Sequence, residues 1–159
     1  MGVSKPAAVI ALAVAAFTGC GSQAGDEEAP GEAVTTRVVR VIDGDTIEVS
    51  IEGQDEDVRY IGVDTPETVK PGTPVQCFGP QASAENDRLV EGRTVRLVFD
   101  RERRDAYGRL LAYVYTRAEA GKSRFANAAL VRNGYARTLT IPPNTAPAAV
   151  SARSVIVSS

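Results

Sequence analysis

The chain has 159 residues, a formal net charge of −2 from 18 Lys and Arg against 20 Asp and Glu, and a hydrophobic fraction of 43%, which fits one folded domain. It contains no His and no Trp. The absence of His excludes Ser-His and Cys-His nucleophile pairs and the usual zinc ligand set. A metal site must therefore use oxygen ligands, which favours calcium, magnesium or manganese, and a general base must be Asp, Glu, Lys, Tyr or a metal-bound hydroxide.

Residues 1–20 have the pattern of an export signal. Lys5 supplies a positive charge, and Ala7–Phe17 is an apolar run too short to span a bilayer comfortably. The run ends in Phe17-Thr18-Gly19-Cys20, which resembles a bacterial lipobox. We therefore expect Cys20 to carry a lipid that anchors the protein to the outer face of the membrane, with no other membrane contact. Cleavage near Ala13-Val14-Ala15, which would give a freely secreted protein, is the alternative.

Residues 21–33 have the composition of a flexible acidic tether, with four acids and no apolar period. Without Lys5 and these acids, residues 34–159 carry 17 Lys and Arg against 16 Asp and Glu. If Cys20 is lipidated, Cys77 has no partner for an internal disulfide. We expect Cys77 to be buried as a small apolar side chain, with pairing between molecules as the alternative.

Val34–Ile42 is rich in β-branched residues and predicts the first strand. Asp43-Gly44 predicts a hairpin turn, because both residues tolerate a positive φ. Alternating apolar residues over Ile47–Ile51 predict the second strand. After a polar turn at Gly53–Asp57, Val58–Val63 predicts its antiparallel partner.

This hairpin brings acidic residues together. The start of its first strand lies beside the end of its second, so we expect Asp45 and Asp64 to be close at one end of the sheet. Thr65 and Glu67 follow on the loop just beyond. Three carboxylates so close together are costly unless a cation or an arginine neutralises them.

The rest of the chain predicts a small barrel. Its elements are a surface loop (Thr68–Gly79), a helix (Gln81–Glu91, with Pro80 first and Ala82 and Leu89 inward), a strand (Thr94–Phe99), a charged turn (Asp100–Gly108), a strand (Arg109–Tyr115) and a second helix (Arg124–Asn133) before Gly134. Five short strands and two packed helices predict an α+β, mainly β fold, a closed barrel of the OB type over residues 34–144. Residues 145–159 have no helical stripe and are expected to be poorly ordered.

The charged turn is strongly basic. Arg101, Arg103, Arg104 and Arg109 cluster around it. The cluster predicts either a solvated loop or a phosphate-facing patch.

Five motifs, in this order, resemble the staphylococcal nuclease (thermonuclease) family, over roughly Thr36 to Asn144. They are Val41-Ile42-Asp43-Gly44-Asp45-Thr46, then Arg59 with Val63-Asp64-Thr65-Pro66-Glu67-Thr68, then Gly79-Pro80-Gln81-Ala82-Ser83, then Asp105-Ala106-Tyr107-Gly108-Arg109-Leu110-Leu111-Ala112-Tyr113, and Ala129-Leu130-Val131-Arg132-Asn133-Gly134. The family usually has a third, C-terminal helix. Residues 145–159 do not resemble one, so the ending looks truncated or frame-shifted.

The resemblance implies a set of site residues. Asp45, Asp64 and the backbone carbonyl of Thr65 would bind Ca²⁺, Arg59 and Arg109 would hold the scissile phosphate, Glu67 would orient or deprotonate the attacking water, and Tyr107 would contact a nucleotide. Calcium prefers carboxylate and carbonyl oxygens, and the planar arginine fork matches phosphate oxygens. Taken singly, each residue also has a structural explanation: a hairpin turn, a salt bridge or, for Tyr107, a packed loop aromatic.

Some positions depart from the family. Ala106 stands where the staphylococcal enzyme has a lysine. Thr140 and Pro142 stand near the positions at which that enzyme has two tyrosines that contact the base, and neither is aromatic. Base contacts should therefore be weaker or different.

The resemblance implies a monomeric, calcium-dependent nuclease that acts outside the cytoplasm. It would hydrolyse phosphodiester bonds of single-stranded or frayed DNA and RNA by cleaving the 5′ P–O bond. The alternative is a non-catalytic OB-fold lipoprotein that binds nucleic acid or another anionic polymer.

Overall fold

The computed structural model describes residues 1–2, 31–69, 72, 74–117, 123–145 and 147. The expected export signal with Cys20, most of the expected tether and nearly all of residues 145–159 lie outside the described residues. Within the described part of the chain, no helix is both long enough and apolar enough to cross a membrane.

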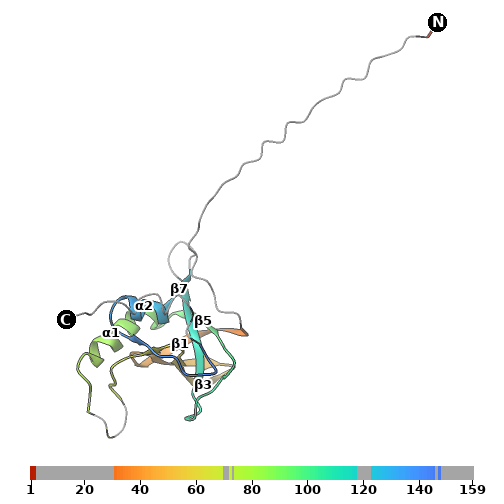
Figure 1. Cartoon of the computed structure of the whole chain (residues 1–159). Helices are drawn as coiled ribbons and strands as arrows, with labels where there is room; N and C mark the ends of the chain where they lie inside the picture. The colour runs from red at the N-terminus through yellow and green to blue at the C-terminus, as the bar shows by residue number, and fades with distance from the viewer. Residues whose placement is uncertain (3–30, 70–71, 73, 118–122, 146, 148–159) are drawn as a thin grey trace.

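Five strands form a closed barrel, as predicted (Figure 1). They are β1 (Ala33–Asp43), β2 (Thr46–Ile51), β3 (Gln54–Tyr60), β5 (Thr94–Val98) and β6 (Leu110–Arg117). Neighbours in the order β3-β2-β1-β5-β6 pair antiparallel, and a parallel pairing of β3 with β6 closes the barrel. Closure leaves these strands without a free edge, which is how small barrels satisfy their backbone.

Three short strands were not predicted. β7 (Ser123–Phe125) extends the sheet beside β6, and β4 (Val63–Asp64) pairs with β8 (Arg137–Thr138) in a separate two-stranded sheet. The predicted third strand, Val58–Val63, is therefore divided: β3 ends at Tyr60, and the chain turns before β4.

The turn between β2 and β3 is shorter than predicted. Only Glu52 and Gly53 lie between the two strands, with φ values of 52° and 81°. Positive φ at both central residues defines the tight type I′ turn that suits two-residue hairpins. The prediction of a polar turn over Gly53–Asp57 is wrong, because residues 54–57 are polar but pair with β2 through their backbone.

The β1–β2 hairpin at Asp43-Gly44 is confirmed, since Asp43 pairs with Thr46. The predicted reason for Gly44 is wrong, because Gly44 does not have a positive φ. A Cβ atom at this position would lie 2.7 Å from Thr65 Oγ1 and 3.0 Å from the Cβ of Ala82. Glycine is needed here because a loop and a helix approach the turn closely.

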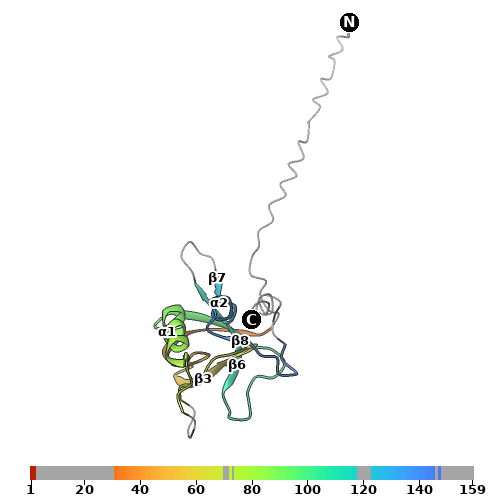
Figure 2. The same cartoon turned by 60° about the vertical axis from the view of Figure 1, so that its left-hand side comes forward.

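Both predicted helices are present, on the same side of the barrel (Figures 1 and 2). α1 (Gly79–Val90) has Pro80 in its first turn, and α2 (Ala126–Arg132) is followed by Gly134 at a φ of 80°. The predicted inward residues of α1, Ala82 and Leu89, are buried. The described residues therefore confirm the predicted barrel with two packed helices.

Two buried asparagines connect the helices to the barrel. Asn86 on α1 accepts a hydrogen bond from Tyr60 Oη (2.9 Å) and donates one to the carbonyl of Asp43 (2.9 Å). Asn127 on α2 accepts one from the amide of Val114 (2.9 Å) and donates one to the carbonyl of Ile61 (2.8 Å). Asn86 thus fixes the ends of β1 and β3, where the candidate site lies.

The prediction for Cys77 is wrong. Its thiol is free and its side chain is exposed. Cys77 lies on the segment before α1, which runs over the surface and contributes little to the core.

Candidate active site

All seven residues predicted for the active site line one cavity of about 470 Å³. They are Asp45, Arg59, Asp64, Thr65, Glu67, Tyr107 and Arg109. The cavity lies where β2 begins and β3 ends, because Thr46 pairs with Arg59 across these strands. The predicted meeting of the acidic residues at one end of the sheet is therefore confirmed.

Asp45 is one of the buried carboxylates of the cavity. Its Oδ2 atom accepts hydrogen bonds from the amide of Thr65 (2.8 Å) and from Thr65 Oγ1 (2.9 Å). The same oxygen lies 3.1 Å from Nη1 of Arg59. Burial raises the pKa of Asp45, while the Arg59 charge and the two Thr65 hydrogen bonds act in the opposite direction. Asp45 therefore fixes the loop that carries Thr65.

Arg59 connects two carboxylates. Besides its contact with Asp45, its Nη2 atom lies 3.3 Å from Oδ1 of Asp64. Its Nη1 atom donates to the carbonyls of Tyr60 (3.1 Å) and Val63 (2.9 Å). The backbone and the two acids together hold the guanidinium in one orientation at the cavity.

Arg137 is a site residue that the sequence did not indicate. It lies on β8 opposite Asp64 on β4, and its Nε and Nη2 atoms are 2.8 Å and 2.7 Å from Oδ2 of Asp64. No motif marks Arg137, because its place depends on the pairing of two strands of two residues each, far apart in the sequence.

Asp43 is a second site residue that the sequence did not indicate, although it is the first acid of the Asp-Gly-Asp turn. It is buried, and its Oδ1 atom accepts hydrogen bonds from the amide of Gly44 (2.7 Å) and from Thr68 Oγ1 (2.6 Å). Burial and the neighbouring Asp43 carboxyl raise the pKa of Glu67. Asp43 therefore acts on both the loop geometry and the charge of Glu67.

Asp105 positions Arg109. Its Oδ2 atom is 2.7 Å from both Nε and Nη2 of Arg109, and its Oδ1 atom accepts the amides of Tyr107 (2.9 Å) and Arg109 (3.0 Å). The guanidinium of Arg109 lies 5.4 Å from the ring centre of Tyr107. Tyr107 is 83% exposed, so the alternative of a packed loop aromatic is wrong.

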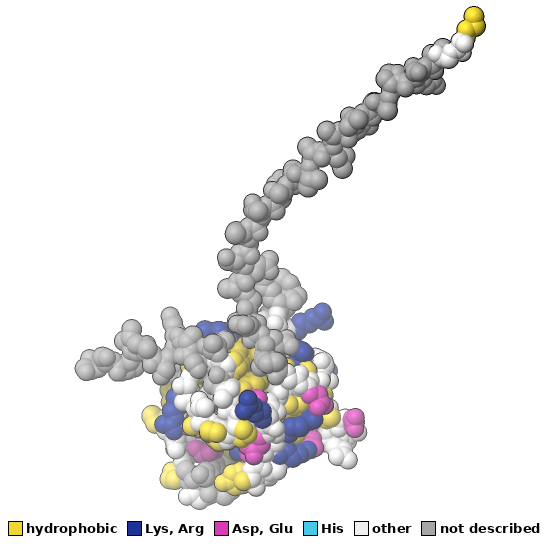
Figure 3. All heavy atoms as spheres, turned by 45° about the vertical axis from the view of Figure 1, so that its right-hand side comes forward, with side chains coloured by type: hydrophobic (Ala, Val, Ile, Leu, Met, Phe, Trp, Pro, Cys, Tyr) yellow, Lys and Arg dark blue, Asp and Glu magenta, His cyan; other side chains and the backbone are white. Residues whose placement is uncertain are grey.

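The other arginines of the charged turn do not line the cavity. Arg103 pairs with Glu32 at 2.7 Å, and Arg104 forms a two-pronged pair with Glu56, with both contacts at 2.9 Å. On the face that Figure 3 presents, basic and acidic side chains are intermixed. A solvated loop therefore describes this turn better than a shared phosphate patch.

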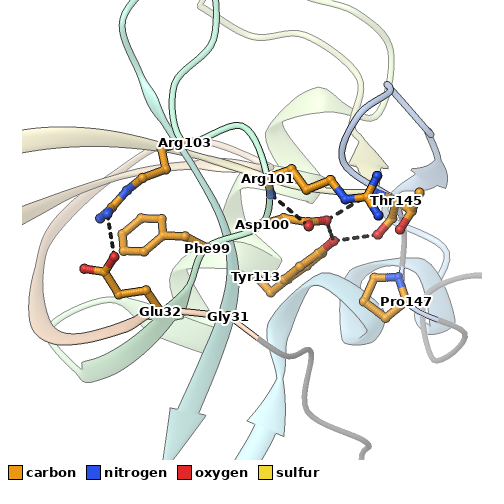
Figure 4. A pocket seen from close by; sticks show the side chains of 9 residues that line it. All are labelled: Gly31, Glu32, Phe99, Asp100, Arg101, Arg103, Tyr113, Thr145 and Pro147. Atoms are coloured by element: carbon orange, nitrogen blue, oxygen red, sulfur yellow. Dashed lines mark hydrogen bonds and ion pairs between the residues drawn. The ribbon is translucent and has the colours of Figure 1, made fainter.

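Another cavity, of about 530 Å³, is lined by none of the seven residues predicted for the active site (Figure 4). Tyr113 Oη lies within hydrogen-bond distance of Asp100 Oδ2 and of the carbonyl of Thr145. Asp100 also accepts the amides of Arg101 (2.8 Å) and Thr145 (3.2 Å). These contacts hold Thr145 against the barrel. The polar side chains of this cavity therefore have a structural role.

The donor set of the candidate site suits calcium by its chemistry. As the side chains lie, the described residues contain no group of three acidic or cysteine side chains in a metal-holding arrangement. Asp45, Asp64 and Thr65 nevertheless offer hard oxygen donors on the same cavity. Because burial disfavours the charged form of Asp45, a divalent cation would stabilise that form.

The fold and the cavity define an OB-type barrel with a carboxylate and arginine site at one end of its sheet. The family model described as staphylococcal nuclease homologue matches residues 57–152. The thermonuclease of Staphylococcus intermedius is 53% identical over 107 residues, which cover 67% of this chain and 61% of the relative. The chain therefore belongs to the staphylococcal nuclease family, and the resemblance is confirmed.

Two further relatives agree. The thermonuclease of Staphylococcus hyicus is 44% identical over 138 residues, which cover 87% of this chain and 79% of the relative. The endonuclease YncB of Bacillus subtilis (strain 168) is 47% identical over 114 residues, which cover 70% of this chain. The chain spans only 52% of the length of YncB and 61% of the S. intermedius protein.

Proposed function

We propose that this chain is a nuclease that hydrolyses phosphodiester bonds of DNA and RNA. The observation that carries the proposal is the convergence of Arg59, Arg109 and five carboxylates on one cavity; the carboxylates are those of Asp43, Asp45, Asp57, Asp64 and Glu67. The cavity offers cations for a phosphate, acids for a metal ion and a base for water, which are the groups that phosphodiester hydrolysis requires. The relatives named thermonuclease and endonuclease support this assignment.

The two arginines bind the scissile phosphate in this proposal. Arg59 is fixed by two backbone carbonyls, and Arg109 is fixed by Asp105. Planar guanidinium groups pair with two phosphate oxygens at once and stay charged as negative charge grows in the transition state. Loss of one such donor commonly raises the barrier by about 2.7–4 kcal/mol.

Asp45, Asp64 and the carbonyl of Thr65 would hold Ca²⁺. When bound, the ion would polarise a phosphate oxygen and offset the charge of the carboxylates. The hydrogen bonds of Thr65 to Asp45 keep the backbone of Thr65 next to that carboxylate. These contacts bring the proposed ligands together from two separate parts of the chain.

Glu67 orients the attacking water and accepts its proton. The water oxygen then bonds to phosphorus in line with the departing 5′ oxygen, the 5′ P–O bond breaks, and that oxygen takes up a proton. The products are a 3′-phosphate and a 5′-hydroxyl. The exposed ring of Tyr107 at the rim favours an unpaired nucleotide, because a base can stack on it only when it has left a duplex.

The proposal also retains the predicted location. The protein would act as a monomer outside the cytoplasm, attached to the outer face of the membrane by a lipid on Cys20, or freely secreted.

Cleavage of a labelled single-stranded oligonucleotide tests the proposal. With calcium, the chain should release 3′-phosphate and 5′-hydroxyl ends, and Arg59→Lys and Glu67→Gln should each lower kcat strongly. Arg40→Lys is the matched control, because Arg40 pairs with Glu48 at 2.7 Å on β1 and does not line the cavity. Binding without any cleavage would refute the proposal and leave a non-catalytic barrel.

A further inference from the structure

A second cavity, of about 310 Å³, adjoins the proposed active site. Asp64 and Thr65 line both cavities, so the second one continues directly from the first. Phe78, Tyr135 and Arg137 line the second cavity only. A nucleic-acid strand whose scissile phosphate is bound in the first cavity can therefore extend into the second cavity.

Phe78 and Tyr135 form a stacked aromatic pair in this cavity. Their ring centres are 5.5 Å apart, and their planes differ by 13°. Phe78 comes just before α1 and Tyr135 just after α2, so the packing of the two helices brings the rings together. Phe78 is 46% exposed, whereas Tyr135 is partly buried against the core. Unpaired bases stack on aromatic surfaces that solvent can reach, whatever the identity of the base.

The backbone at Phe78 argues against a purely structural role for its ring. Phe78 has a φ of 73°, in the left-handed region that favours glycine and is unusual for a bulky residue. The ring is not held there by burial, since Phe78 is 46% exposed. A strained position with an exposed aromatic ring, next to the proposed active site, points to binding.

Arg137 supplies a cation to the same cavity. Its side chain is 81% exposed, although it pairs with Oδ2 of Asp64 at 2.7 Å. Because the guanidinium of Arg137 is exposed, it can donate hydrogen bonds to a phosphate from solvent without leaving a buried position. An arginine beside stacked aromatic rings is the combination that single-stranded nucleic acid recognition uses.

We propose that the second cavity is a nucleotide subsite for single-stranded nucleic acid. The base of a nucleotide next to the scissile phosphate stacks on Phe78 and Tyr135, and its phosphate pairs with Arg137. This inference rests on the proposed nuclease function and specifies how the substrate extends beyond the cleaved bond. Tyr107 does not line this cavity, so the subsite is distinct from any contact that Tyr107 makes.

Binding and cleavage are measured separately. Binding uses fluorescence anisotropy of a labelled single-stranded octanucleotide, with Glu67→Gln as the background so that no cleavage interferes. Phe78→Leu and Arg137→Gln should each raise the Kd at least about fivefold. In the background with Glu67 intact, the ratio of kcat/KM for the octanucleotide to that for a dinucleotide should fall by a similar factor.

The controls isolate the ring and the charge. Val75→Ala changes an exposed apolar residue of the same segment that does not line the cavity, and Arg40→Gln removes an exposed arginine elsewhere. Neither control should change the Kd or the ratio. Phe78→Gly serves as a second variant, because glycine suits the φ of this position and removes the ring without adding strain.

The outcomes distinguish the two proposals. If the octanucleotide is bound but never cleaved by the protein with Glu67 intact, the nuclease function fails while the anisotropy still tests the subsite. A Kd within twofold of the parent in Phe78→Leu, Phe78→Gly and Arg137→Gln would overturn the subsite. An equal loss of affinity for inorganic polyphosphate in Phe78→Leu would also overturn it, because polyphosphate has no base to stack.

Discussion

Replacement of Gly44 by alanine should damage the candidate site from a position that contacts no substrate. The new Cβ atom would lie 2.7 Å from Thr65 Oγ1, 2.9 Å from Thr65 Cβ and 3.0 Å from the Cβ of Ala82. A rotation of the Thr65 side chain cannot relieve the contact with its Cβ, because that atom is fixed to the backbone. The loop must therefore move away from Asp45, which accepts two hydrogen bonds from Thr65.

The expected cost follows from these contacts. Overpacking in a tight site costs about 1–3 kcal/mol. Loss of one of the hydrogen bonds from Thr65 to the Asp45 carboxylate adds about 1.5–3 kcal/mol. We expect Gly44→Ala to lower the free energy of unfolding by about 2.5–6 kcal/mol, or the Tm by about 10–24 °C at about 4 °C per kcal/mol. Cleavage should fall as well, because Thr65 is a proposed calcium ligand.

Thermal melts followed by circular dichroism test this prediction, with Gly92→Ala as the matched control. Gly92 has a φ of 64°, but a Cβ there would meet nothing within 4 Å. That variant should cost only about 1–2 kcal/mol for its backbone conformation and leave cleavage unchanged. If Gly44→Ala melted at the parent temperature and cleaved normally, the close approach of Thr65 and Ala82 would not be what requires glycine at this position.

Three further predictions concern other parts of the chain. Asp105→Asn keeps the turn but removes the anionic partner of Arg109, so kcat should fall about tenfold in steady-state kinetics, with Tm unchanged; an unchanged kcat would remove Asp105 as a positioning residue. The hydrogen bond from Arg88 holds the pKa of Glu85 below its usual 4.5, so Glu85 contributes stability above pH 4.5 that is lost as pH falls through its folded-state pKa. Glu85→Gln should therefore lower the Tm at pH 7 much more than at pH 3, and an equal loss at both would contradict this. Cys20→Ser should move the protein from the membrane fraction to the medium or block its processing, and unchanged fractionation would argue against lipidation.

The sequence predicted the elements whose signals are local. Alternation in β2, Pro80 at the start of α1 and Gly134 after α2 each act within a few residues, and the structure confirms all three. The meeting of Asp45 with Asp64 was also predictable, because a single hairpin connects them. Local patterns therefore predicted the barrel and the meeting of Asp45 with Asp64, whereas the other site residues were implied by the resemblance to the family.

Features that depend on distant contacts were not predictable. Arg137 reaches Asp64 only through the pairing of β4 with β8, and no periodicity marks strands of two residues. Gly44 resembles an ordinary turn glycine, and only the packed structure reveals Thr65 and Ala82 against it. The apolar character of Cys77 suggested burial, yet the chain before α1 runs over the surface. In each case, tertiary packing overrides a reasonable local expectation.

The most direct test of the proposed function is the calcium dependence of cleavage by the purified protein. Single-stranded DNA should be cleaved when calcium is present, left intact when a calcium chelator is added in excess, and cleaved again when calcium is restored. This result would fit an oxygen-ligand site formed by Asp45, Asp64 and the carbonyl of Thr65. Undiminished cleavage in chelator would contradict the calcium site, and intact DNA in calcium would contradict the nuclease itself.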